Sequence, residues 1–229
     1  MRSVERLFVL WSETGDRRYI IGELWRTPDG SFAFAYVDSL ADVESKGFRL
    51  LPEFPMPQRS AEPYLSTSLF STFAQRIPST KRPDRAEIFS SWGIEHVDDP
   101  LEILAVSGGI QLTDRLELAE YRTAEDQLDR PLTFRLAGSR FHATASRLQV
   151  GDELEVRVEP ENRYDQCATV VLRDGTSVGY VPRQYSALVA GLLRASVPLE
   201  ASVIRRLIVP EERGRWIVRL RRKEQRLAG

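Results

Sequence analysis

Short apolar runs separated by turn residues along the first part of the chain predict β-structure. Leu7 to Trp11 and Tyr19 to Trp25 are largely apolar and flank Gly15-Asp16, which indicates a β-hairpin. The next stretch has an aromatic residue at every second position, so one face of a strand carries Phe32, Phe34 and Tyr36. We expect these strands to share a core.

The pattern then changes from strand to loop and helix. Four prolines between Leu51 and Tyr64 predict a loop on the surface. Beyond this loop the spacing favours three helices, at residues 68–76, 82–92 and 101–106. Asp98-Asp99-Pro100 has the residue types of a helix cap and first turn, and Gly108-Gly109 has those of a helix stop.

The second part of the chain contains a polar turn followed by a hairpin and a helix. Asn162 is the only asparagine in the sequence, and its amide is suited to bonding the backbone of a tight turn. Cys167 to Arg173 and Thr176 to Val181 read as strands around Asp174-Gly175, a type I′ turn signal. Pro182 is expected to start a helix that runs to about Arg194.

Two motifs in this part resemble the HIRAN domain. They are Glu159-Pro160-Glu161-Asn162-Arg163-Tyr164-Asp165-Gln166-Cys167-Ala168 and Val178-Gly179-Tyr180-Val181-Pro182-Arg183. The resemblance covers roughly Phe134 to Leu207. It implies a small β-barrel of the kind that is often attached to DNA-processing enzymes and that holds the 3′ end of single-stranded DNA.

The resemblance also implies a set of nucleic-acid contacts. They are expected on the first strand of the domain, in the turn and after the hairpin, at Arg140, Phe141, His142, Asn162, Tyr164, Asp165, Tyr180 and Arg183. The chain departs from the family where Phe141-His142 replaces two tyrosines and Tyr180 replaces a histidine.

These residue types suit the end of a single strand. Aromatic rings stack on bases, arginines bind phosphate oxygens, and Asp165 would accept a hydrogen bond from a terminal hydroxyl. The alternative is structural: Asn162 and Asp165 only shape the turn, and Tyr164 packs in the core.

The first part of the chain has a second resemblance, to the N-terminal subdomain of HipA-type toxin kinases. It spans roughly Phe8 to Leu118 and rests on short motifs, which are Gly22-Glu23-Leu24, Gly30 to Tyr36, Phe73-Ala74-Gln75-Arg76-Ile77-Pro78, Asp99-Pro100-Leu101-Glu102-Ile103-Leu104 and Ser107-Gly108-Gly109. The family has an aspartate where this chain has Ile110. The residues that a kinase needs for nucleotide, metal and catalysis are not found, so the resemblance implies an accessory subdomain detached from its kinase.

Charge divides the chain as these resemblances do. Residues 1–130 contain 15 basic and 22 acidic residues, a net charge of −7, and residues 131–229 contain 17 and 11, a net charge of +6. We therefore expect an α+β protein with a mixed α/β HipA-N-like domain at residues 1–122, a linker at 123–130 and a small HIRAN-like β-barrel with one or two helices at 131–229.

The sequence favours binding over catalysis. His96 and His142 lie far apart and Cys167 is the lone cysteine, so no zinc spacing or intramolecular disulfide is expected. Phosphate-binding loop, dinucleotide-binding and nucleophile-elbow motifs are absent from the sequence, and no cofactor is predicted. No apolar run is long enough for a signal peptide or a spanning helix, which predicts a soluble cytoplasmic protein without a membrane partner.

The resulting prediction is a non-catalytic protein that recognises single-stranded DNA or a DNA 3′ end. Its N-terminal domain would couple this recognition to a protein partner, such as a DNA-processing enzyme. The alternative is an antitoxin-like regulator that binds a HipA-type kinase and uses the HIRAN-like part as a scaffold.

Overall fold

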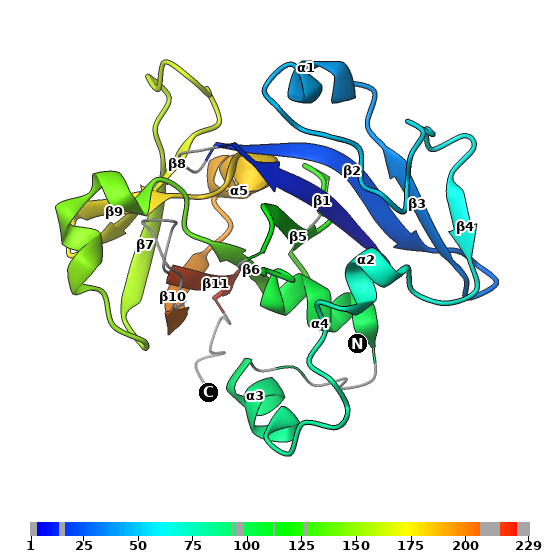
Figure 1. The fold of residues 1–229 in the computed structure, drawn as a ribbon. Coiled ribbons are helices and arrows are strands. Elements are labelled where there is room, and N and C mark those ends of the chain that lie inside the picture. The colour runs from blue at the N-terminus through cyan, green and yellow to red at the C-terminus, as the bar shows by residue number, and fades with distance from the viewer. Residues whose placement is uncertain are drawn as a thin grey trace. The chain divides into compact units, whose positions relative to one another are not determined.

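The chain forms two compact units, Met1–Tyr121 and Arg122–Gly229, in a computed structural model (Figure 1). The structure describes residues 4–13, 17–92, 94, 99–111, 113–125, 128–206 and 216–223. The predicted turn at Gly15-Asp16, as well as His96 and Asp98, lies outside the described residues.

The first unit is built on an antiparallel sheet of five strands in the order β4-β3-β2-β1-β5. The strands are β1 (Arg6–Ser12), β2 (Arg18–Arg26), β3 (Phe32–Tyr36), β4 (Tyr64–Ser66) and β5 (Leu116–Glu120). The predicted hairpin and aromatic strand are confirmed, since β1 pairs with β2 and all five residues of β3 are buried. The aromatic core that results includes Phe34, Phe54 and Phe73, with the rings of Phe34 and Phe54 4.2 Å apart.

The helices of this unit are short. They are α1 (Leu40–Glu44), α2 (Ser71–Ala74), α3 (Arg85–Trp92) and α4 (Pro100–Ser107). Asp99 caps α4 as predicted, because its carboxylate accepts a hydrogen bond from the backbone amide of Leu101 at 2.9 Å. Gly108 ends the helix with a φ of +75°, which confirms the glycine stop.

A buried tyrosine holds the predicted proline-rich loop against the sheet. The hydroxyl of Tyr36 donates to the carbonyl of Phe54 at 3.0 Å and accepts from the amide of Leu51 at 2.9 Å. Burial raises the pKa of Tyr36 to about 12. This one hydroxyl therefore satisfies two backbone groups of a segment that prolines keep from forming a regular ladder.

The polar stretch from Glu120 to Arg130 begins inside the first sheet. Glu120 is the last residue of β5 and pairs with Leu7, and only 6 % of Glu120 is exposed. The charge of this stretch favours a linker, although the predicted linker itself covers only residues 123–130. Pairing of β5 with β1, residues far apart along the chain, buries its first residue instead.

The second unit contains a curled antiparallel sheet of six strands in the order β6-β11-β10-β7-β8-β9. The strands are β6 (Leu132–Arg135), β7 (Glu153–Val158), β8 (Thr169–Arg173), β9 (Thr176–Tyr180), β10 (Leu199–Arg206) and β11 (Trp216–Arg222). Asp174 and Gly175 between β8 and β9 have φ values of +50° and +71°. Positive φ at both positions is the requirement of the predicted type I′ turn, which is therefore confirmed.

The two edges of the curled sheet meet at one residue pair. Ala137, just beyond β6, exchanges two backbone hydrogen bonds with Tyr180 at the end of β9, at 2.9 and 2.8 Å. Gly179 makes this approach possible, since its φ is +150° and a Cβ there would lie 2.7 Å from the carbonyl oxygen of Ala137. The glycine of the second motif thus closes the sheet into a half-barrel.

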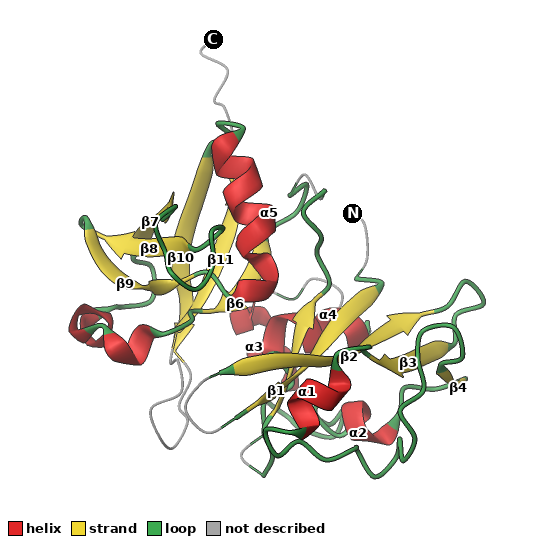
Figure 2. Cartoon of the chain, turned by 90° about the horizontal axis from the view of Figure 1, so that it is seen from above, coloured by secondary structure: helices red, strands yellow, loops and turns green. Residues whose placement is uncertain are grey.

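Helix α5 (Arg183–Arg194) packs against the curled sheet (Figure 2). Tyr185, Leu188 and Val189 form its buried face at the i, i+3, i+4 spacing of an amphipathic helix. Pro182 precedes the first residue of the helix, so the predicted start and end are both confirmed. Within the described residues, no helix is both long and apolar enough to cross a membrane.

Two short 3₁₀ helices replace part of the strand that the sequence predicted. They are η1 (Ser139–Phe141) and η2 (Ala143–Arg147). The placement of Arg140, Phe141 and His142 on the first strand was therefore wrong. Gly138 adopts a left-handed conformation, with a φ of +67°, and turns the chain out of the sheet immediately before these residues.

Candidate nucleic-acid interface

Four segments meet at one end of the curled sheet. The turn at residues 159–168 connects the end of β7 to the start of β8. Tyr180 ends β9 and pairs with Val170 near that start, and α5 begins three residues later. The bridge to Ala137 adds the chain that enters η1. Antiparallel pairing thus gathers every segment that carries a predicted site residue.

Asn162 organises the turn from its centre. Its side-chain oxygen accepts hydrogen bonds from the backbone amides of Tyr164 at 3.0 Å and Asp165 at 3.3 Å. Its side-chain nitrogen donates to the Glu159 carboxylate at 2.7 Å. A side chain with both a donor and an acceptor is needed at this position, because one group contacts the backbone and the other a carboxylate.

Asp165 links the turn to the first turn of α5. Its Oδ1 accepts from the amide of Cys167 at 2.8 Å, and its Oδ2 lies 2.6 Å from the hydroxyl of Ser186. Ser186 is 4 % exposed. The two polar residues therefore have the structural roles that the sequence left open as the alternative to ligand binding.

His142 and Tyr180 lie together behind the turn. Their ring centroids are 5.9 Å apart, with a tilt of 55° between the planes. Phe141 precedes His142 in the chain, and the guanidinium of Arg140 lies 4.4 Å from the centroid of the Phe141 ring. The η1 segment thus carries a cation stacked on an aromatic ring.

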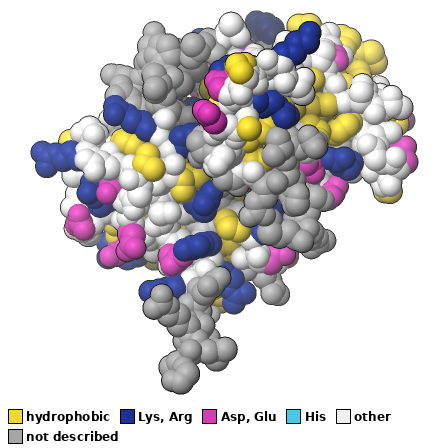
Figure 3. All heavy atoms as spheres, turned by 90° about the horizontal axis from the view of Figure 1, so that it is seen from below, with side chains coloured by type: hydrophobic (Ala, Val, Ile, Leu, Met, Phe, Trp, Pro, Cys, Tyr) yellow, Lys and Arg dark blue, Asp and Glu magenta, His cyan; other side chains and the backbone are white. Residues whose placement is uncertain are grey.

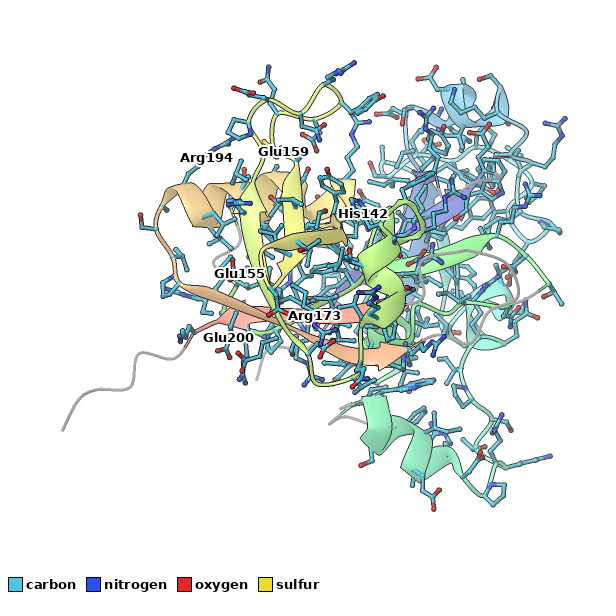
Figure 4. All side chains as sticks on the ribbon, turned by 90° about the vertical axis from the view of Figure 1, so that its left-hand side faces the viewer. His142, Glu155, Glu159, Arg173, Arg194 and Glu200 are labelled. Atoms are coloured by element: carbon cyan, nitrogen blue, oxygen red, sulfur yellow. The ribbon has the colours of Figure 1, made fainter. Side chains whose placement is uncertain are left out.

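Glu159 connects the turn around Asn162 to the His142 and Tyr180 rings. It bonds Asn162 in the turn, and burial together with the charge and hydrogen bond of Glu159 raises the pKa of Tyr180. Burial also lowers the pKa of His142, and the Glu159 charge opposes that shift. Figure 4 shows Glu159 and His142 toward the same end of the strands, with Arg173 toward the other.

Phe141 and Tyr164 project into solvent. Their exposed fractions are 74 % and 86 %, the highest of the large apolar side chains that the structure describes in the second unit. The alternative in which Tyr164 packs in the core is wrong. Arg140 and Arg183 are exposed as well, whereas Asn162, Asp165, His142 and Tyr180 are half-buried.

Two residues of this arrangement were not among the predicted contacts. Glu159 opens the first motif and lies three residues before Asn162, a spacing that in a tight turn allows a side-chain bond. Ser186 carried no such signal, because its partner Asp165 is distant in sequence. The role of Glu159 could be predicted from the sequence of the turn, whereas the role of Ser186 could be found only from the three-dimensional structure.

The described residues contain one free cysteine and no cluster of metal ligands. These residues include no group of three or more His, Cys, Asp or Glu side chains that could hold a metal ion. Cys167 is half-buried, and its sulfur lies 3.8 Å from a guanidinium nitrogen of Arg194.

Arginines on the strands of the second unit are partly neutralised. Arg221 pairs with Glu200 across β10 and β11, and Arg173 pairs with Asp152 at 3.0 Å. Figure 3 shows basic and acidic side chains interspersed on the face that it draws. Exposed ion pairs of this kind contribute little to stability and reduce the net field of the strand arginines.

Known proteins match the region that contains the interface. The family model of the HIRAN domain matches residues 131–207. The crystal structure of the HIRAN domain of human HLTF is 17% identical, with coverage of 39% of this chain and 71% of that chain and a TM-score of 0.33. A crystal structure of a protein from Lactobacillus plantarum is 23% identical, with coverage of 40% and 91% and a TM-score of 0.30. No curated relative matches the chain.

The matches support one of the two predicted resemblances and leave the other without support. None of them supports a likeness of residues 8–118 to HipA-type kinases, which stays a prediction. Strand β11 lies beyond the matched residues, yet it pairs with β6 and β10 in the same sheet. The family match supports a HIRAN domain at residues 131–207 of this chain.

Proposed function

We propose that the HIRAN domain of this chain binds single-stranded DNA, with a 3′ end as the preferred ligand, and that it does so without catalysis. The observation that carries the proposal is the exposure of two aromatic rings, Phe141 on η1 and Tyr164 on the turn at residues 159–168. The resemblance to the HIRAN family implied the same ligand.

Both rings are accessible to a ligand, because most of each side chain faces solvent. Large apolar side chains are usually buried, and an exposed aromatic ring on each of two segments that meet at this end of the sheet is suited to stacking on unstacked bases. Each stacked base typically contributes about 1–3 kcal/mol and is accepted whatever its identity. Phe141 lacks the hydroxyl of the family's tyrosine, so at this position the chain relies on stacking.

Two arginines lie on the segments that meet at this end of the sheet. Arg140 stacks on Phe141, and the exposed Arg183 starts α5. The N-terminal end of a helix also carries partial positive charge from its free amides, which favours a phosphate near Arg183. The two cations would thus bind phosphates on both sides of a stacked base.

Asp165 is the residue suited to a terminal hydroxyl. Its carboxylate already accepts from the Cys167 amide and lies within hydrogen-bonding distance of the Ser186 hydroxyl, but a carboxylate has about four lone-pair sites. A free 3′ hydroxyl would donate to one of the remaining sites. A 3′ phosphate would place negative charge there and be repelled.

Binding of fluorescent oligonucleotides, followed by anisotropy, tests the proposal. We expect Tyr164→Ala and Phe141→Leu each to weaken binding by about 1–3 kcal/mol, and Phe141→Tyr to retain it. The matched control is Val150→Ala, which trims another exposed apolar side chain of the same unit, 62 % exposed, and should change nothing.

Two further measurements separate phosphate binding by Arg183 from recognition of the 3′ end. Arg183→Ala should reduce the slope of log affinity against log salt by about 0.7, because one phosphate contact is lost. A 3′-phosphorylated strand should bind more weakly than a free one. Equal affinities for the two strands would remove the end preference, and absence of binding at low salt would refute the nucleic-acid proposal.

The proposal also assigns coupling to a protein partner to residues 1–121. What supports it is the charge of the first part of the chain, −7 over residues 1–130, which disfavours a direct contact with nucleic acid. Capture of a DNA-processing enzyme by the full chain should fail when the surface of the first unit is changed. Capture that depends only on second-unit residues such as Arg183 would refute this assignment.

A further inference from the structure

A cleft in the first unit has the size and lining of a small-molecule site. Its volume is about 750 Å³, within the range of roughly 300–1,000 Å³ that ligand pockets occupy. Trp11, Phe48, Leu51 and Leu116 give it an apolar floor, and each is at most 9 % exposed. The cleft is independent of the nucleic-acid interface, which is made by residues of the second unit.

The acidic residues of the cleft are engaged in holding its walls. Glu53 accepts hydrogen bonds from the amides of Ser71 and Thr72 at 3.0 and 2.7 Å. Burial opposes ionisation of Glu53, but these bonds outweigh it and lower its pKa. The carboxylate is therefore charged at neutral pH and is satisfied by the start of α2.

The second acidic residue is paired inside the protein. Asp114 bonds the guanidinium of Arg76 through both carboxylate oxygens and accepts from the amide of Leu116 at 3.0 Å. The Arg76 side chain is 1 % exposed and also donates to the carbonyl of Gly109 at 2.8 Å. This pair neutralises itself and fixes the wall of the cleft.

Two basic residues of the lining are left for a ligand. Arg49 is exposed and donates only to the carbonyl of the preceding Phe48, among the contacts that the described residues make. Arg115 is exposed, and its side chain makes no hydrogen bond or ion pair with the described part of the chain. The cleft thus combines an apolar floor with uncompensated positive charge at its rim.

We propose that this cleft binds a small organic anion, an apolar body that carries one carboxylate or phosphate. The body would lie on the Trp11 and Phe48 floor, and the anionic group would meet the planar donor groups of Arg49 and Arg115. The surface amide of Gln75 borders the same space and would face the ligand.

The test uses the full chain with two fluorescent probes of similar shape. 8-Anilinonaphthalene-1-sulfonate is anionic, and N-phenyl-1-naphthylamine is its uncharged counterpart. We expect one saturable site for the anionic probe. Arg115→Gln removes a positive charge and Gln75→Glu adds a negative one, so each lowers the net charge of the cleft by one unit. Each should weaken the anionic probe about two- to fivefold, and both together about tenfold. Neither should affect the neutral probe.

The matched control is Lys81→Gln, which makes the same change of charge at an exposed residue outside the cleft lining and should leave both probes unchanged. Unaltered thermal unfolding must accompany each comparison, because loosened proteins bind the anionic probe indiscriminately. Absence of saturable binding, or equal weakening by Lys81→Gln, would overturn the proposal.

Competition then identifies the anionic group. Displacement of the anionic probe by adenosine monophosphate indicates a phosphate ligand, and displacement by 1-naphthoate indicates a carboxylate ligand. Either result supports the site. Failure of both compounds to displace the probe would show that it binds elsewhere, and the proposal would be wrong.

Discussion

Gly179 should be the least replaceable residue of the second motif, because the sheet closes over it. A Cβ at this position would lie 2.7 Å from the Ala137 carbonyl oxygen and 2.8 Å from Cγ of Leu136. Overpacking of this kind costs about 1–3 kcal/mol. The φ of +150° is nearly restricted to glycine and adds about 1–3 kcal/mol for any other residue. Gly179→Ala should therefore destabilise the second unit by about 2–6 kcal/mol.

Gly175→Ala is the control that separates the two costs. Gly175 has a φ of +71°, yet no atom lies within 4 Å of a Cβ placed there. Only conformational strain remains, about 1–2 kcal/mol. The melting temperature of the second unit should fall by about 4–8 °C per kcal/mol, so the two variants should differ clearly in calorimetry.

Hydrogen exchange locates the effect. Gly179→Ala should accelerate exchange of the amides in β8, β9 and Ala137, the residues that the closing bridge connects, while exchange in β1 to β5 stays as it was. Equal losses of stability for the two variants would refute the argument that close approach, and not only φ, requires glycine at Gly179.

Three further changes test individual interactions. Tyr36→Phe should cost about 1–3 kcal/mol of stability in the first unit by denaturant unfolding, because the buried Leu51 amide and Phe54 carbonyl both lose their partner. Ser186→Ala should cost about 1–3 kcal/mol in the second unit and accelerate amide exchange in the turn at residues 159–168. Ser146→Ala, at an exposed serine of the same unit that bonds only the nearby Ala143 carbonyl, should leave that turn unchanged. Burial lowers the pKa of His142 from 6.5, so the unfolded chain binds this proton more tightly. The stability contributed by neutral His142 is present above pH 6.5 and lost as the pH falls through the lowered value, and His142→Gln should flatten that loss in a series of melting temperatures.

The parts of the fold that were predictable from sequence depend on local chemistry. The Asp174-Gly175 turn, the Asp99 cap and the start of α5 after Pro182 are each determined by a few neighbouring residues. Such signals are readable because the backbone conformation that they require is intrinsic to those residue types.

The parts that were not predictable depend on pairs distant in sequence. Strand β5 has a charged end that reads as a linker until its pairing with β1 is known. The 3₁₀ segment at Arg140 and Phe141 reads as a strand, because only Gly138 marks the exit from the sheet. The bond between Asp165 and Ser186 could not be inferred at all without the packing of α5.

The same distinction divides the candidate site into a scaffold and a contact surface. Asn162 and Glu159 direct their polar atoms toward the turn and Tyr180, so their replacement would move the loop itself. Asp165 belongs to both parts, because it bonds Ser186 of α5 and keeps lone-pair sites for the proposed terminal hydroxyl. Phe141 and Tyr164 form the contact surface, because most of each ring faces solvent. Where a residue that contacts the ligand differs from the family's residue, the ligand atoms that it can bind change. Where a residue that holds the loops differs, the positions of the contacting side chains change. Phe141 in place of a tyrosine is of the first kind and keeps a stacking face. Tyr180 in place of a histidine is of the second kind, because its hydrogen bond to Glu159 ties the last strand of the sheet to the turn.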